Sequence, residues 1–130
     1  MNLAGLAELL SGGEKIPGCE LAHSDAVALV GFYFPGRPYC LVADWIVVYL
    51  AVSPRQLKIV VRGGVTPTLV NALFVLHDSK GRFRRGHWVR TSLAVSFTHD
   101  CLFETKNTVY VLMGPGRRVQ TDLDVALSLY

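Results

Sequence analysis

The chain has 130 residues, of which 51% are hydrophobic and 18% charged, and its formal net charge at pH 7 is +3. This length suits one domain. The longest apolar run, residues 40–52, is broken by Asp44 and is shorter than the ~20 residues that span a bilayer. The N-terminus lacks an early positive charge, and Glu8 interrupts its apolar stretch, which argues against a secretory signal. We therefore predict a cytoplasmic protein without a membrane span.

The N-terminal part of the chain contains one clear helix pattern and two ambiguous stretches. Leucines spaced along one face of residues 2–10 predict a short amphipathic helix, which ends at the glycines that follow. Pro17 and Gly18 favour a loop within the ambiguous residues 14–24. Residues 26–34 are apolar throughout, so their pattern leaves both a buried strand and a short helix open.

The middle of the chain is predicted to contain buried strands on either side of a helix. β-Branched and aromatic residues within residues 39–52 favour one or two buried strands. Ser53 followed by Pro54 is typical of a helix start, because serine caps the first turn and proline fits the first helical position. The apolar side of this helix is formed by Leu57, Val60 and Val61. Residues 66–76 favour another strand, with a continued helix as the alternative.

Period-two alternation begins at Trp88 and marks the most regular part of the chain. Three strands are predicted, over residues 88–97, 101–105 and 108–113. The first turn contains Asp100, and the second contains Asn107, which tolerates the left-handed conformation that a two-residue hairpin turn needs. A Gly-Pro-Gly segment that begins at Gly114 ends this meander. Residues 123–127 indicate a terminal helix or strand.

These elements predict an α+β fold, a small single domain with a curved antiparallel sheet that contains the meander over residues 88–113. The helix over residues 54–62 and a terminal helix are expected to pack on this sheet. The three cysteines lack CxxC spacing, so neither a disulfide framework nor a zinc ribbon is indicated. Cys40 and Cys101 stand in apolar strands and are predicted to be small core residues.

The turn that enters the meander is the most strongly charged part of the sequence. It carries basic and aromatic side chains, and no acidic residue occurs between Asp78 and Asp100. Its candidate binding residues are Lys80, Arg82, Arg84, Arg85, His87, Trp88 and Arg90. Cations interleaved with rings can neutralise phosphates and stack on bases, and they can also contact an acidic protein. The alternative is a solvated loop that only keeps a sheet edge from pairing with another chain.

No pattern in the sequence indicates a catalytic or metal centre. Nucleophile elbows and metal-binding histidine pairs are absent, and the few carboxylates form no readable acid–base pair. A cluster of His77, His99 and Cys101 is a conceivable metal site. A cleft that joins Asp78, His99 and Asp100 would support the hypothesis of an enzyme. We predict no catalytic residue, no metal ion and no cofactor. A polar row is expected to satisfy one hairpin turn, and it consists of Thr105, Asn107, Thr108 and Tyr110.

The chain resembles a small uncharacterised domain family of proteobacteria in two stretches, RGHWVRTS and CLFETKNTVYVLMGPGRR. Members of that family occur in genomes rich in prophages and other mobile elements. The resemblance covers residues 44–118, whereas residues 1–43 are unassigned, and it implies no activity. The resemblance implies that the following residues are signature positions of that family: Trp88, Arg90, Thr91, Thr105, Asn107, Thr108, Tyr110 and Gly114.

Together these observations give one lead hypothesis and two alternatives. The lead is a non-enzymatic interaction protein that binds a host protein or nucleoprotein. The resemblance implies a mobile-element origin for it, and with that an anti-CRISPR-like counter-defence role. The first alternative is direct RNA or DNA binding through the basic turn over residues 80–90, and the second is an unrecognised enzyme. A homodimer also stays open, because the apolar fraction can exceed what one small core buries.

Overall fold

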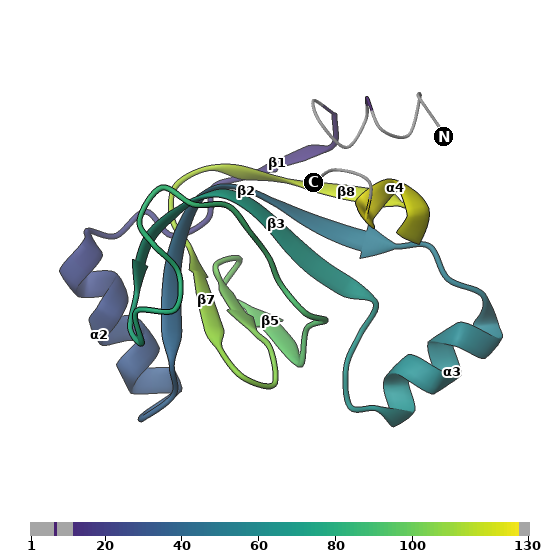
Figure 1. The fold of residues 1–130 in the computed structure, drawn as a ribbon, viewed down its shortest axis with the longest axis horizontal. Helices are drawn as coiled ribbons and strands as arrows, with labels where there is room; N and C mark the ends of the chain where they lie inside the picture. Colours follow the sequence, from purple (N-terminus) through teal and green to yellow (C-terminus); the bar gives the residue numbers. More distant parts are fainter. Residues whose placement is uncertain (1–6, 8–11, 128–130) are drawn as a thin grey trace.

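The computed structural model describes residue 7 and residues 12–127, with side chains described as far as Val125. These residues form an α+β fold in which one curled sheet carries three short helices (Figure 1). The elements in chain order are β1 (Glu14–Ile16), α2 (His23–Tyr33), β2 (Tyr39–Leu50), α3 (Pro54–Arg62), β3 (Thr68–Asp78), β4 (Val89–Arg90), β5 (Ser96–Thr98), β6 (Leu102–Glu104), β7 (Val109–Leu112), β8 (Gly116–Thr121) and α4 (Leu123–Leu127). The helix predicted over residues 2–10 lies outside the described residues except for Ala7, which is helical.

Across residue 7 and residues 12–127, no helix is long and apolar enough to cross a bilayer. The longest of these helices, α2, has 11 residues, about half of the ~20 that a span requires.

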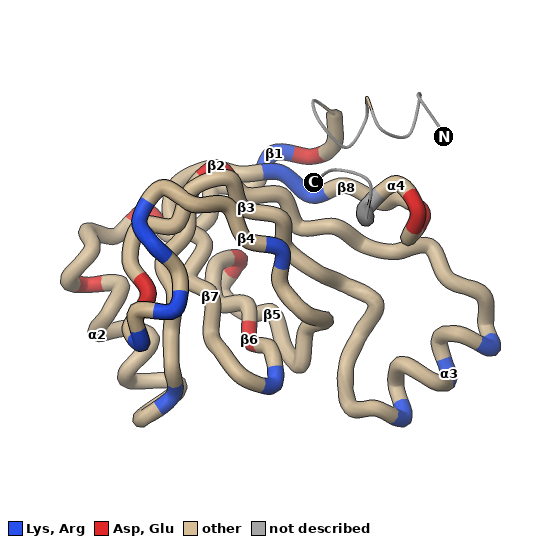
Figure 2. The backbone as a smooth tube through the Cα atoms, in the orientation of Figure 1, with Lys and Arg blue, Asp and Glu red and all other residues tan. Residues whose placement is uncertain are grey.

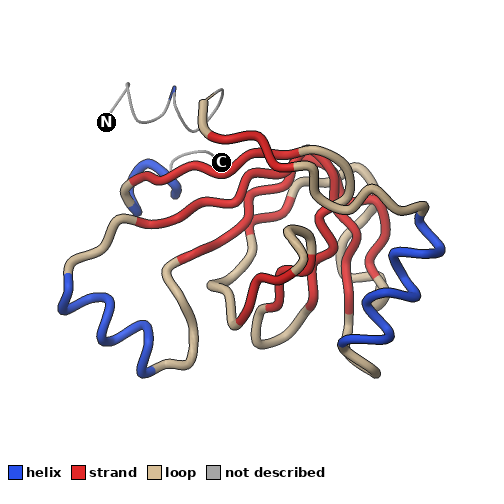
Figure 3. Tube along the Cα trace, turned by 180° about the vertical axis from the view of Figure 1, so that it is seen from behind, coloured by secondary structure: helices blue, strands red, loops and turns tan. Residues whose placement is uncertain are grey.

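The sheet has eight strands and is organised around β2, which changes its partner along its length. On one side, β2 pairs antiparallel with β3 over most of its residues. On the other side, it runs parallel to β7 over its first half and parallel to β8 over its second half. The strand order is β1-β8-β2-β7-β6-β5, with β3 and then β4 on the far side of β2. The curl predicted for the sheet is visible in Figure 3, but the sheet is mixed rather than antiparallel throughout.

The change of partner occurs at Asp44 and Trp45, where β2 bends. Asp44 has a φ of 52°, a left-handed conformation that is uncommon for a residue with a side chain. The Trp45 indole N–H donates to the carbonyl oxygens of Met113 and Gly114, each at 3.2 Å. A Cβ atom on Gly116 would lie 2.3 Å from this indole, so only glycine fits beside the ring. The Gly-Pro-Gly segment therefore holds the bend and leads directly into β8.

The segment over residues 88–97 is not one strand, contrary to prediction. β4 pairs with β3, whereas β5 pairs with β6. Between them the Thr91 hydroxyl accepts from the Val70 N–H at 2.9 Å and donates to the Ser92 carbonyl at 2.8 Å. The Val70 N–H therefore bonds to a side-chain oxygen instead of a strand carbonyl, while the Thr91 N–H still donates to the Val70 carbonyl at 2.9 Å. The meander itself consists of β5, β6 and β7.

Both predicted turns of the meander are present, but left-handed backbone occurs in the first and not in the second. His99 and Asp100 join β5 to β6 with φ values of 58° and 53°. Asn107 does not have a positive φ, so the conformation predicted for it is wrong. In that turn the Thr105 backbone N–H and hydroxyl both donate to the Thr108 carbonyl, at 2.8 and 3.0 Å. Side-chain hydrogen bonding thus stabilises the turn without a left-handed residue.

The structure also decides the alternatives that the sequence left open. Residues 26–33 belong to helix α2, residues 39–50 form the single strand β2, residues 68–76 belong to strand β3, and residues 123–127 form helix α4. Strands β1 and β8 were not predicted, because their sequences EKI and GRRVQT lack a long apolar alternation.

Two clusters of buried side chains lie on the sheet. The larger includes Trp45 and Phe103 and joins β2 and β3 to α2, β6 and β7. The smaller joins the second half of β2 to the start of β3, to β8 and to Val125 of α4, which packs on the sheet as predicted for a terminal helix. Helix α3 contains no buried residue, so the prediction that it packs on the sheet is wrong. Because β2 ends at Leu50 and β3 begins at Thr68, α3 lies beyond the ends of both strands.

Candidate functional site

The basic turn is a loop between β3 and β4 that is anchored by the ion pair of Asp78 and Arg82. Arg82 donates from Nη2 to Asp78 Oδ1 at 2.8 Å and from Nε to Oδ2 at 3.1 Å. The backbone N–H groups of Arg82 and Phe83 donate to the same Oδ2, at 2.6 and 3.2 Å. Arg82 Nη1 also donates to the Thr108 hydroxyl at 2.7 Å, which ties the loop to the β6–β7 turn. Asp78 and Arg82 are therefore structural residues of the loop.

Each member of this pair stabilises the charge of the other. Burial alone would raise the pKa of Asp78, but the hydrogen bonds and the charge of Arg82 outweigh burial and hold that pKa below its ordinary value of 3.8. Hydrogen bonding to Asp78 raises the pKa of Arg82 above its ordinary value. Both groups are charged at neutral pH, so the loop keeps this geometry there.

The tip of the loop presents its remaining cations to solvent. Lys80 and Arg84 are exposed, and their side chains make no hydrogen bond or ion pair with the described residues. Arg85 lies over the ring of Phe74, 5.5 Å from its centroid, and donates to the Leu76 carbonyl at 3.0 Å. Figure 2 shows basic positions gathered along the loop after β3, at the end of the molecule remote from α3.

The other predicted binding residues, His87, Trp88 and Arg90, lie where the loop enters β4, and they line two different hollows. Trp88 and Leu73 are 50% and 54% exposed, and with Gly86 and His87 they line a shallow hollow of about 570 Å³. Arg90 is half-buried and lines a separate groove beside α3. The structure thus connects Trp88 to the loop and separates Arg90 from it.

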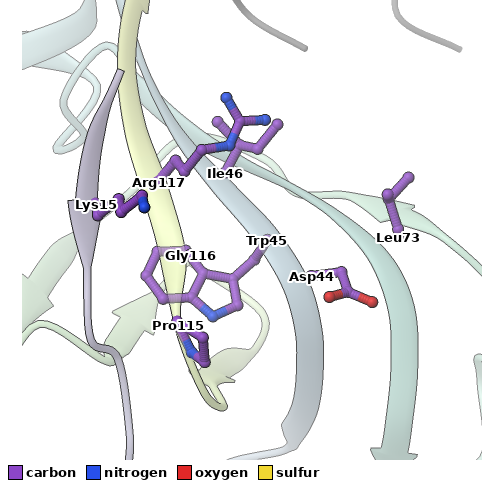
Figure 4. A pocket seen from close by; sticks show the side chains of 8 residues that line it. All are labelled: Lys15, Asp44, Trp45, Ile46, Leu73, Pro115, Gly116 and Arg117. Carbon is purple, nitrogen blue, oxygen red and sulfur yellow. The ribbon is translucent and has the colours of Figure 1, made fainter. Parts of the chain in front are cut away.

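A second hollow adjoins the first through Leu73 and was missed by the sequence analysis. It has a volume of about 410 Å³ and is lined by Lys15, Asp44, Trp45, Ile46, Leu73, Pro115, Gly116 and Arg117 (Figure 4). The side chains of Lys15 and Asp44 lie on opposite sides of it. The hollow arises at the bend of β2, where β1, β2 and β8 meet. Local sequence patterns carry no signal for such a meeting.

The groove beside α3 was also missed, because the apolar side of α3 was expected to be buried. Its volume is about 480 Å³. Ile59 and Val60 line it from the helix, and Leu50 and Leu69 line it from the ends of β2 and β3. It is mainly apolar, so it can accept a hydrophobic segment but offers little for an ionic ligand.

The polar row around the β6–β7 hairpin serves the turn, as predicted. The Thr108 N–H donates to the Thr105 hydroxyl at 3.2 Å. Arg37 holds the same turn from the other side, with Nη1 at 2.6 Å from Glu104 Oε2 and Nη2 donating to the Thr105 carbonyl at 2.9 Å. Two arginines, Arg37 and Arg82, therefore fix this hairpin to the rest of the fold.

The three residues considered as a metal site, His77, His99 and Cys101, do not come together in the structure. Within the described residues, no three His, Cys, Asp or Glu side chains come together in a way that could hold a metal ion. His77 lies beside His23, with ring centroids 5.5 Å apart, whereas His99 lies in the exposed β5–β6 turn. Cys40 and Cys101 are buried, as predicted, and burial raises the pKa of each thiol to about 12. Neither is a thiolate nucleophile at neutral pH.

One buried polar side chain on the sheet is unsatisfied. Asn71 is 1% exposed, and its two amide atoms make no hydrogen bond with the described residues. In the strand register it stands opposite Ile46 and Arg90, and it shares a face of β3 with Leu73. An unsatisfied buried amide costs about 1–3 kcal/mol. The fold therefore carries an unfavourable group on the face that presents Leu73.

Comparison with known proteins identifies a family but no activity. A family described as a domain of unknown function (DUF6957) matches residues 17–128. The chain belongs to this family. The DUF6957 match includes most of the residues before residue 44, which the sequence resemblance left unassigned. No curated protein and no solved structure matches the chain.

Proposed function

We propose that this member of the DUF6957 family is a non-enzymatic interaction protein that binds an acidic protein partner. The proposed contact residues are Lys80, Arg84, His87 and Trp88, whereas Arg85 is engaged within the protein. The observation that carries the proposal is the half-exposed Trp88, which lines a hollow with Leu73 at the base of a rigid, basic loop. Tryptophan and arginine are the residue types in which protein-binding hot spots are enriched.

The Asp78–Arg82 pair supports the proposal because it orders the loop before a partner arrives. The Asp78 carboxylate accepts from two backbone N–H groups and two guanidinium N–H groups, at 2.6 to 3.2 Å. Association ordinarily costs ~0.5–1.5 kcal/mol for each side chain that becomes immobilised, in addition to ordering of the loop. A loop that is already fixed avoids the second cost.

The charges of the loop favour a protein partner over RNA or DNA. Arg82 and Arg85 make contacts within the protein, which leaves Lys80 and Arg84 as the loop cations without a described partner. Nucleic-acid affinity rises with the number of phosphates that cations neutralise, each adding ~0.9 to the salt dependence of binding. Two such cations give weak electrostatic binding. An apolar hollow with a basic border fits a protein surface better.

Three further statements about this protein remain predictions that rest on the sequence and its family resemblance. They are a mobile-element origin with an anti-CRISPR-like role, a cytoplasmic location and the absence of enzymatic activity. The proposed contact surface does not depend on them, because it is argued from side-chain exposure and from hydrogen bonds within the loop.

The test compares two variants with equal changes of charge. Lys80→Glu/Arg84→Glu reverses the loop cations, and Lys15→Glu/Lys106→Glu reverses two exposed cations outside the loop and outside α3 as the control. Each full-length protein captures partners from a bacterial lysate, which are quantified by mass spectrometry. A captured acidic protein is then purified and titrated by calorimetry. We expect the loop variant to raise Kd by about tenfold or more, which corresponds to ~1.4 kcal/mol, and the control to leave Kd unchanged.

Two outcomes would overturn the proposal. The first is the same set of captured proteins and the same Kd for the wild type and the loop variant. The second concerns labelled RNA and DNA oligonucleotides, tested at low and at physiological salt. Binding that falls steeply with salt and is lost in Lys80→Glu/Arg84→Glu would favour the nucleic-acid alternative instead. Arg82 is left unchanged in all variants, because its loss would disturb the loop itself.

A further inference from the structure

Helix α3 stands apart from the packed body of the protein (Figure 1). None of its nine residues is buried, and Leu57, Ile59 and Val61 are 42%, 63% and 59% exposed. A capping box holds its first turn, in which the Ser53 hydroxyl accepts from the Gln56 N–H at 3.1 Å and the Gln56 side chain accepts from the Ser53 N–H at 2.9 Å. Isolated helices shorter than ~12–15 residues are marginal in water. An amphipathic helix of this length, with its apolar side exposed, is therefore expected to pack against something further.

The groove beside α3 provides an apolar surface of matching character. Ile59 and Val60 form one wall of it, and Leu50 and Leu69 form the other. Leu123 of α4 also lines the groove and is 45% exposed. Each molecule therefore offers both an uncovered apolar helix and an open apolar groove next to it.

The charges on the two sides of this groove are opposite. Helix α3 has three cations and no acidic residue, namely Arg55, Lys58 and Arg62. Across the groove, Asp122 and Asp124 flank Leu123 and are exposed. Figure 2 shows the same division, with basic positions along α3 and acidic positions at α4. At helical spacing the cations lie on the side of α3 away from Leu57 and Val60.

We infer that a second copy of this chain covers this face, with α3 of each copy in the groove of the other. Such a twofold contact uses the same surface on both copies. Leu57 and Val61 would lose their exposure, and the cations of α3 would lie near Asp122 and Asp124 of the second copy. An acidic partner bound to the cations alone would leave the apolar side of α3 in water. A second copy matches both the apolar and the charged parts of the surface.

This interface is separate from the surface proposed for the acidic partner. The basic loop after β3 and helix α3 lie at opposite ends of the molecule in Figure 1. A dimer through α3 therefore leaves Lys80, Arg84 and Trp88 of both copies accessible. Failure of one proposal does not imply failure of the other.

Sedimentation velocity over a concentration series tests the inference, because the monomer mass is 14.3 kDa. We expect the wild type to sediment as a dimer at high concentration. Leu57→Glu/Val61→Glu should raise the dimer Kd by about tenfold or more, since each burial of a charge opposes association. Phe32→Glu is the control for adding a charge at an exposed apolar site, because Phe32 of α2 is 77% exposed and lies outside the groove. Circular dichroism verifies that all variants fold.

A charge exchange tests the pairing of the two copies. Asp122→Lys/Asp124→Lys should weaken the dimer, and adding Arg55→Glu/Arg62→Glu should restore it, because opposite charges would meet again. A wild type that is monomeric at every concentration would overturn the inference, and so would equal effects of the α3 variant and Phe32→Glu. A monomer that instead binds anionic phospholipid vesicles through Leu57 and Val61 would overturn it in favour of a membrane contact.

Discussion

The two halves of strand β2 belong to very different parts of this molecule. At Leu41 and Val42 its first half is fully buried within the larger cluster and pairs with β7. The second half, residues 46–50, pairs with β8, contributes most of its side chains to the smaller cluster and ends at the groove beside α3. The bend at Asp44 and Trp45 separates the two.

The difference places most of the buried core at one end of the strand and an open apolar groove at the other. Burial of apolar surface contributes ~25 cal/mol per Å², so the end that holds the larger cluster provides most of the folding free energy. A domain of this size buries only part of its surface. Part of the unburied apolar surface lies at α3, where Leu57, Ile59 and Val61 are exposed.

Truncating one leucine at each end of β2 is the strongest test of this comparison. Leu41 is fully buried, whereas Leu50 is 8% exposed and lines the groove. Leu41→Ala leaves a closed cavity and should lower the free energy of unfolding by about 4 kcal/mol. Leu50→Ala opens onto the groove and leaves no closed cavity, so we expect a loss of about 2 kcal/mol. Urea unfolding of the two variants measures both values.

Protein concentration must be varied in that experiment, because Leu50 lies in the inferred dimer interface. At concentrations where the wild type is monomeric, the difference between the variants reports packing alone. Equal losses with unchanged m-values would contradict the comparison, since they would mean that both ends of β2 are packed to the same degree.

Removing the charge of Asp78 is the next largest change and concerns the loop at the well-packed end. In Asp78→Asn, an amide group replaces a carboxylate oxygen that faces the donors of Arg82 and Phe83. Hydrogen bonds to charged groups contribute ~1.5–3 kcal/mol, and we expect a loss of about 2 kcal/mol at neutral pH. Asp100→Asn is the control, because Asp100 is exposed and asparagine tolerates its left-handed backbone.

The same pair predicts a pH dependence with a definite sign. Because the folded-state pKa of Asp78 is below its ordinary value of 3.8, its stabilising effect is complete above that pH and is lost as the pH falls through the folded-state pKa. The wild type should therefore lose stability relative to Asp78→Asn on acidification below pH 3.8, measured by thermal unfolding. Parallel pH profiles of the two proteins would contradict this role of the pair.

Sequence patterns predicted the long strands and the helix starting at Pro54, missed β1 and β8, and failed at the choice of strand partners. Ser53 and Pro54 marked the start of α3, and apolar runs marked β2 and β3. Alternation cannot show whether neighbouring strands run parallel, and the parallel pairing of β2 depends on residues far away in the chain. Thr91 fits an alternating strand, yet its hydroxyl, and not a backbone carbonyl, accepts from the Val70 N–H. Side-chain to backbone hydrogen bonds of this kind are not visible in a period-two pattern.

The sequence predicted that basic residues cluster in the loop after β3, but it did not predict which of their side chains are engaged within the protein. The sequence places Arg82 and Arg84 together, whereas in the structure the Arg82 side chain bonds to Asp78 and the Arg84 side chain makes no hydrogen bond or ion pair with the described residues. The groove beside α3 was unpredictable for a different reason. An amphipathic pattern predicts burial of the apolar side, and nothing local shows that Leu57 and Val61 lie beyond the sheet they would cover.

The smallest expected effect concerns α3, which lies beyond the end of the second half of β2. Ser53→Ala removes one hydrogen bond of the capping box, a change that typically costs ~1 kcal/mol of helix stability. Because no residue of α3 is buried, this loss should fall on the helix alone. We expect faster amide hydrogen exchange in residues 56–62, with the global free energy of unfolding changed by less than ~0.5 kcal/mol. Exchange measured by NMR reports both quantities.

The concentration dependence of this variant connects the local effect to association. A frayed α3 loses more conformational entropy when it docks, so Ser53→Ala should weaken the inferred dimer. Its melting temperature should equal that of the wild type at low concentration and fall below it at high concentration, where only the wild type gains from association. A global loss of the full ~1 kcal/mol at low concentration would mean that α3 unfolds together with the sheet. The two ends of β2 would then form one cooperative unit.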